Sequence, residues 1–139
     1  MQKSPATPNR RRRVRKRAEF ERIQRDGERI NTRRFVLILS RQLEGSHPSR
    51  LGVTASRRVG NAVVRNRAKR VVREAFRATG DLFREGIDLV VIVRAPLGDT
   101  LLGEVVDEWR AATGVIGRRT AQLLARAPGS RKTPPESPR

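Results

Sequence analysis

Apolar residues recur along the middle of the chain with two different periods, and these periods predict where strands and helices lie. Short runs rich in β-branched and aliphatic residues occur at 33–39, 51–56 and 87–93, and they predict three strands. The third run is almost wholly apolar, which is typical of a buried strand. Helical spacing at 14–26 and 61–79 predicts two helices. This alternation favours an α/β (α+β) domain in two layers.

Glycine and capping residues mark the predicted helix ends. Gly27 follows the first helix and Gly80 follows the second, where a C-terminal stop is expected. A last helix begins after Pro96, with Asp99 or Thr100 as its cap. Its predicted inward positions are Leu101, Val105 and Trp109, and Trp109 is expected in the core.

Two glycines complicate the end of the domain. Gly114 and Gly117 are expected to interrupt the last helix, which resumes over 118–126. The nearby carboxylates Glu104, Asp107 and Glu108 are expected to be solvated.

The two ends of the chain have no apolar period. Residues 1–13 carry the run Arg10 to Arg13 and predict a disordered basic arm, whereas the proline-rich residues 127–139 predict a disordered tail. The sequence therefore predicts one folded domain over residues 14–126.

Charge narrows the class of partner. The chain has 139 residues, a formal net charge of +18 and a pI near 11.9. Such a domain repels itself unless a polyanion neutralises it, and nucleic acid fits this footprint. An anionic membrane surface is the alternative partner. No run approaches the ~18 apolar residues of a spanning helix, and no secretion signal is visible, so a cytoplasmic protein without a membrane partner is expected.

Candidate catalytic residues are scarce. There are no cysteines, and His47 is the only histidine, in a turn where a solvated ring is expected. No pair of carboxylates is arranged for acid–base work or for a two-metal site. The sequence therefore predicts no catalytic or metal-binding side chains.

The second helix carries the strongest signal. At ~100° per residue its apolar side chains share one arc: Val64, Ala68, Val71, Val72, Ala75 and Phe76. The opposite arc and its borders are cationic, with one amide: Arg65, Asn66, Arg67, Lys69, Arg70, Arg73 and Arg77. Only Glu74 lies near this arc with the opposite sign. Like charges at this spacing destabilise a helix by a few tenths of a kcal/mol, roughly, so solvated faces usually mix signs. The pattern favours phosphates opposite the helix over an ordinary solvated face.

The entry to this helix supports an anion site. Asn61 is a plausible N-cap, and Gly60 allows a positive φ or a close backbone approach. Arg57 and Arg58 precede it, and a helix N-terminus among arginines attracts anions.

The run from Val59 to Arg77 closely resembles the signature of the bacterial ribonuclease P protein component. The family's Arg-Asn-Arg motif and the basic helix after it match Arg65-Asn66-Arg67, Lys69, Arg70 and Arg73. The likeness extends over roughly residues 14 to 126. It implies a small mixed sheet packed against helices, as in the ribosomal protein S5 domain 2-like fold, with a left-handed β-α-β crossover where a right-handed one is usual.

The resemblance also implies a function. The protein would join ribonuclease P RNA, one protein per RNA, and help the holoenzyme, an endoribonuclease, remove the 5′ leader of precursor tRNA. The RNA and its bound Mg²⁺ would carry the chemistry, and the Arg-Asn-Arg helix, with Arg77 at its end, would bind the RNA subunit. The leader would lie in a cleft between the first helix and the sheet. Its expected contacts are Phe20, Val36, Ile38, Thr54, Ser56, Arg57 and Arg94.

Departures from the family pattern affect this cleft. Gln24 and Ile38 stand where family members often carry aromatic residues, and only 4% of the chain is aromatic. Base stacking should therefore be weak, and charge should dominate leader binding. Phe20 fits core packing or the cleft equally well, whereas Phe35 favours the core.

Three other functions remain open. A structural RNA binder such as a ribosomal protein has the same size and charge, and the RNA that co-purifies would separate it. A DNA-binding protein would place the basic helix in a major groove, but strands, not a helix-turn-helix partner, precede that helix. A stand-alone nuclease lacks visible catalytic residues.

Overall fold

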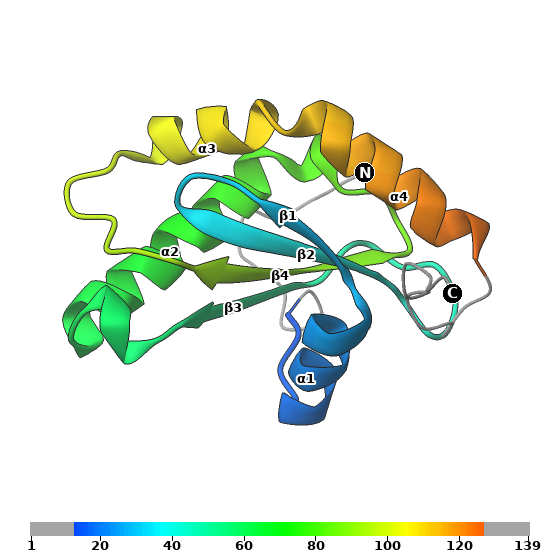
Figure 1. Ribbon diagram of the computed structural model, residues 1–139, viewed down its shortest axis with the longest axis horizontal. Helices are drawn as coiled ribbons and strands as arrows, with labels where there is room; N and C mark the ends of the chain where they lie inside the picture. Colours follow the sequence, from blue (N-terminus) through cyan, green and yellow to red (C-terminus); the bar gives the residue numbers. More distant parts are fainter. Residues whose placement is uncertain (1–12, 127–139) are drawn as a thin grey trace, which may run out of the picture.

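The computed structural model describes residues 13–126, which form a four-stranded sheet with helices on both faces (Figure 1). The strands are β1 (Glu28–Asn31), β2 (Phe35–Arg41), β3 (Leu51–Ala55) and β4 (Ile87–Val93). The helices are α1 (Arg17–Asp26), α2 (Ala62–Ala78), α3 (Leu102–Arg110) and α4 (Thr113–Ala125), with 3-10 turns η2 (Arg57–Val59) and η3 (Gly80–Leu82). The predicted arm and tail lie outside the described residues, apart from Arg13.

The sheet is mixed, as predicted. Its strand order is β1-β2-β4-β3, in which β3 and β4 run parallel and the other neighbours run antiparallel. Helix α2 makes the crossover between the parallel strands β3 and β4. The left-handed sense of this crossover stays a prediction from the resemblance.

The two faces of the sheet bury different cores. Along β2, Phe35, Leu37 and Leu39 point to the face covered by α2, α3 and α4, whereas Val36 and Ile38 point to the α1 face. The first core is the larger one. The second is small because α1 alone covers that face.

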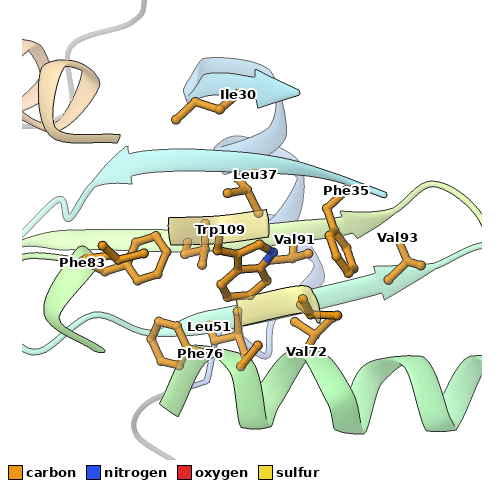
Figure 2. Close-up of a cluster of buried hydrophobic side chains, with 14 of the residues drawn as sticks. Ile30, Phe35, Leu37, Leu51, Val72, Phe76, Phe83, Val91, Val93 and Trp109 are labelled. Carbon is orange, nitrogen blue, oxygen red and sulfur yellow. The ribbon is translucent and has the colours of Figure 1, made fainter. Parts of the chain in front are cut away.

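Trp109 occupies the centre of the larger core, as predicted, and is fully buried. Figure 2 shows its indole between the rings of Phe35 and Phe83. Both rings meet the indole edge to face, with centroids 5.9 and 6.1 Å away. These contacts attach α3 to the sheet and to the segment after α2.

Sequence reasoning missed strand β1 and placed the start of β2 two residues early. β1 carries a single apolar residue, Ile30, because its other inward residue is Glu28. That carboxylate is buried because Arg119 and Arg126 of the C-terminal region bind it at 2.9 and 3.0 Å. Arg33 belongs to the turn between β1 and β2. The first helix likewise begins at Arg17 and not at residue 14.

The last helices also differ from prediction. Helix α3 is capped by Leu101, whose backbone N–H donates to Glu104, and not by Asp99 or Thr100. The helix breaks at 111–112, and both Gly114 and Gly117 lie inside α4. The stripe Ile116, Thr120 and Leu123 is buried at helical spacing. Packing of this stripe overrides the weak helix propensity of glycine.

Figure 1 shows α3 and α4 following one another across the sheet. Within residues 13–126, no helix combines the length and apolarity needed to cross a bilayer.

Gly27, between α1 and β1, tests how tightly α1 is attached. Its φ of −80° suits any residue, but a Cβ would lie 2.6 Å from the Ile23 carbonyl oxygen and from Ile38 Cγ2. We expect Gly27→Ala to lower the free energy of unfolding by about 1–3 kcal/mol through overpacking. Gly80→Ala is the matched control, since no atom lies within 4 Å of its Cβ position. Equal stability of the two variants in urea unfolding would contradict this account.

Candidate nucleic-acid interface

Helix α2 begins as the sequence predicts. The Asn61 side chain accepts a hydrogen bond from the backbone N–H of Val64 at 3.0 Å, so it is the N-cap. Gly60 has a φ of +148°, a conformation that favours glycine, and a Cβ there would lie 2.7 Å from Val64. The turn η2 places exposed Arg57 and Arg58 immediately before this cap.

The cationic side chains of α2 leave the helix in three directions. Ala68, Val72, Ala75 and Phe76 are buried and define the core side. Along one border lie the half-buried Arg65, Lys69 and Arg73, and on the outward side lie the exposed Asn66, Arg70 and Arg77. Arg67 lies on the other border and donates to the Thr100 carbonyl oxygen at 3.0 Å, beside α3. The predicted set therefore extends around the solvent side of α2, where Glu74 is the one carboxylate of the helix.

Helix α2 carries one exposed carboxylate, Glu74, among its many cations. Among residues 13–126, no Arg or Lys of α2 forms an ion pair within 4.0 Å of a carboxylate. Other arginines do: Arg34, for example, binds Glu108 at 2.7 Å and Glu104 at 3.4 Å. The expectation that Glu108 is solvated is wrong, because Thr32 also donates to it.

Helix α1 and the sheet form the second candidate surface. Two rows of residues run across this face of the sheet. The inner row is Arg29, Ile38, Val90 and Gly52, and the outer row is Asn31, Val36, Ile92 and Thr54. Helix α1 packs on the inner row, where Ile38 and Val90 are fully buried with Ile23. The outer row, where Ile92 and Thr54 are half-buried, remains beside the helix.

Phe20 packs on the β3 end of the inner row. It is half-buried and its ring lies against Gly52, where a Cβ would come within 2.8 Å of the ring carbons. The ring therefore both packs on β3 and presents an edge to solvent. Phe35 is fully buried in the larger core, as the sequence predicted.

The predicted leader contacts divide by exposure. Ser56, Arg57 and Arg94 are exposed, and Arg94 donates to the Thr32 carbonyl oxygen at 3.0 Å. Thr54 is half-buried, and Val36 is 9% exposed. Ile38 is 0% exposed beneath α1, so its prediction as a direct contact is wrong.

Sequence reasoning also missed Ile92. Its alternation along β4 places it on the α1 face, but only the strand order shows that it lies between Val36 and Thr54.

A polar network holds α1 in place. Asp88 on β4 is 0% exposed, and its carboxylate accepts from Arg50 at 2.8 Å and from the Gln42 amide at 3.0 Å. Arg50 also binds Glu19 of α1 at 3.1 Å. The hydrogen bonds that the Arg50 guanidinium donates to Asp88 are the main cause that raises the pKa of Arg50 above its usual range. This network joins α1 to β4, and no motif in the sequence indicated it.

The described residues include no cluster of side chains suited to a metal ion. Within residues 13–126, no group of three or more His, Asp or Glu side chains could hold an ion. The resemblance places the expected Mg²⁺ on the RNA subunit, and this stays a prediction.

Comparison with known proteins identifies the family. The sequence model of the family described as Ribonuclease P matches residues 9–116. The chain belongs to the ribonuclease P protein family. The predicted fold and the predicted role as a protein component of ribonuclease P, a tRNA-processing ribonuclease, agree with this membership.

Relatives match over most of their length. The ribonuclease P protein component of Shouchella clausii is 39% identical over 120 residues, covering 86% of this chain and 93% of the relative. That of Thermotoga petrophila is 36% identical over 120 residues, covering 86% and 95%.

Solved structures of the family agree in fold. The ribonuclease P protein of Staphylococcus aureus has a TM-score of 0.65 at 32% identity, covering 75% of this chain and 94% of that one. The Thermotoga maritima protein has a TM-score of 0.53 at 32% identity, covering 84% and 98%.

Arg50 tests the attachment of α1. Arg50→Met keeps the apolar stem but leaves Asp88 buried without its guanidinium. We expect a loss of about 2–3 kcal/mol in unfolding free energy, below the ~3–5 of a fully buried pair because Arg50 is partly exposed. Arg17→Met, which breaks the exposed Arg17–Glu21 pair, is the control and should change little. Chemical denaturation measures both, and equal effects would show that the network does not hold α1.

Proposed function

We propose that this chain binds ribonuclease P RNA through the solvent side of α2, as one protein per RNA, and holds the 5′ leader of precursor tRNA beside α1. The observation that carries the proposal is the cationic surface of α2, whose arginines and lysine form no ion pair with a carboxylate among the described residues. In water such a surface is electrostatically unfavourable, and RNA phosphates would neutralise it.

Arginine predominates on this surface, which suits structured RNA. A guanidinium presents a planar fork that binds phosphate oxygens in pairs and stacks on bases. Asn66 adds an amide that both donates and accepts hydrogen bonds. These contacts would set the register of the protein on the RNA.

The groove beside α1 suits a single strand. Its proposed floor is the outer row around Ile92 and Thr54, and Phe20 forms one border. Exposed Arg57 and Arg94 lie near the ends of β3 and β4, where they would reach backbone phosphates. With one aromatic edge, stacking contributes little and charge contributes most.

We assign the hydrolysis to the RNA subunit and its bound Mg²⁺, with the protein positioning precursor tRNA. The proposed place of action is the cytoplasm. The purified chain should restore precursor-tRNA cleavage by a bacterial ribonuclease P RNA at low Mg²⁺. Failure to do so, together with ribosomal RNA as the main co-purifying species, would favour the ribosomal alternative.

Arg70 tests the α2 surface. It is exposed and makes no ion pair among the described residues, so Arg70→Ala should leave the fold intact. We expect affinity for ribonuclease P RNA to fall, and the slope of log affinity against log salt to shrink by about 0.7–0.9, the value for one phosphate. Arg118→Ala, at an exposed position of α4, also removes one positive charge and should leave the slope unchanged. A salt-titrated binding assay measures both, and identical slopes would argue against α2.

Phe20 tests the groove. Phe20→Ala removes the ring edge and should weaken binding of precursor tRNA to the holoenzyme by a few-fold, roughly 1 kcal/mol for one stacked base. Binding of mature tRNA, which has no leader, should be unchanged. A thermal melt of the variant controls for folding, because the ring also packs on Gly52. Equal losses for both tRNAs would show that Phe20 does not act on the leader.

A further inference from the structure

The segment before α1 lies along the outer edge of the sheet. Arg13 forms a parallel bridge with Leu51 of β3, and the Val14 backbone N–H donates to the Leu51 carbonyl oxygen at 2.9 Å. Val14 is 4% exposed and packs in the smaller core on the α1 face. Side chains alternate along extended backbone, so Arg13 points to the other face, on which α2 lies.

Helix α2 packs on β3, and Arg65, Lys69 and Arg73 lie along one border of this helix. Nε of Arg13 and Nε of Arg65 are both buried, and neither has a hydrogen-bond partner among residues 13–126. The pKa of Arg73 is lowered, first by burial and then by the charge of Arg13. The charge of Arg13, which pairs with Leu51 at the edge of β3, therefore acts on Arg73 of α2.

Such a cluster is costly in the protein alone. Guanidinium groups stay charged at any ordinary pH, so the repulsion cannot be relieved by losing a proton. Buried N–H groups without acceptors add a desolvation cost. A phosphate supplies both the negative charge and several acceptor oxygens, and arginine binds it in a bidentate manner.

We propose that Arg13, Arg65 and Arg73 together form a phosphate-binding site at the β3 edge, and that one backbone phosphate of the RNA bound by α2 fills it. The source of the phosphate rests on the proposed function, whereas the site itself rests on the three side chains. The terminal segment is then part of the RNA interface, and its pairing with β3 positions Arg13 for that contact.

Inorganic phosphate tests the site without RNA. In the full-length chain, the arginine Nε–Hε NMR signals are followed during titration with phosphate, with chloride at equal ionic strength as reference. We expect the Arg13, Arg65 and Arg73 signals to shift together with one dissociation constant, and the Arg118 signal to stay. Arg13→Gln should reduce the Arg73 shift at least severalfold. Unrelated shifts, or shifts no larger than that of Arg118, would overturn the site.

Measurements of RNA binding test whether Arg13 and Arg73 contact the same phosphate. Arg13→Gln and Arg73→Gln should each weaken ribonuclease P RNA binding about tenfold, as for a charge-assisted hydrogen bond. The double variant should lose far less than the product of the two, since both act on the same phosphate. Arg118→Gln is the control for charge, and thermal melts control for folding.

The two arms separate the two hypotheses. Fully multiplicative losses, or an Arg13→Gln affinity equal to that of Arg118→Gln, would overturn the shared site while leaving RNA binding by α2 intact. If every α2 variant kept full affinity for RNA while the phosphate shifts were retained, the proposed function and the RNA source of the phosphate would be overturned.

Discussion

Segregation of charge is the constraint on which the rest of the structure depends. The chain carries 32 basic and 14 acidic residues, so most cations have no carboxylate available. The carboxylates that form ion pairs between elements lie away from α2: Glu19 and Asp88 with Arg50, Glu104 and Glu108 with Arg34, Glu28 with Arg119 and Arg126, and Asp81 with Arg110. These pairs attach α1, α3 and α4 to their neighbours. Helix α2 is held by its apolar side, and its arginines and lysine form no ion pair with a carboxylate among residues 13–126.

The crossover explains why α2 can present this surface. It joins the parallel strands β3 and β4, and its buried side, which includes Phe76, packs into the larger core that contains Trp109. The terminal segment pairs with the outer edge of β3, so cations from the start of the chain and from α2 meet at one edge of the sheet. Helix α1 lies on the other face, where we propose that the leader binds. One four-stranded sheet thus separates the two candidate surfaces.

Local patterns predicted the elements well where one residue type dominates. The strand at 87–93, the Asn61 cap, the cationic side of α2 and buried Trp109 were all predictable because helical spacing, capping chemistry and apolar runs act within a few residues. Local patterns could not predict strand β1, the burial of Ile38 or the Arg50–Asp88 network, because each depends on a partner far along the chain. Glu28 in β1 is inward-facing only because Arg119 and Arg126 reach it. The prediction that Gly114 and Gly117 interrupt the last helix failed for the same reason, because tertiary packing decides whether they break a helix.

The most direct measurement places a cleavage probe on the surface of α2. The chain has no cysteine, so a single cysteine can carry an iron chelate that cuts nearby RNA. Val63 is 77% exposed beside the α2 cations, and its replacement changes no charge; exposed Ala121 on α4 provides the control. In the assembled particle, Val63→Cys should produce defined cuts in ribonuclease P RNA, and Ala121→Cys should produce few. Strong cuts from α4 with none from α2 would contradict RNA binding by the cationic side of α2.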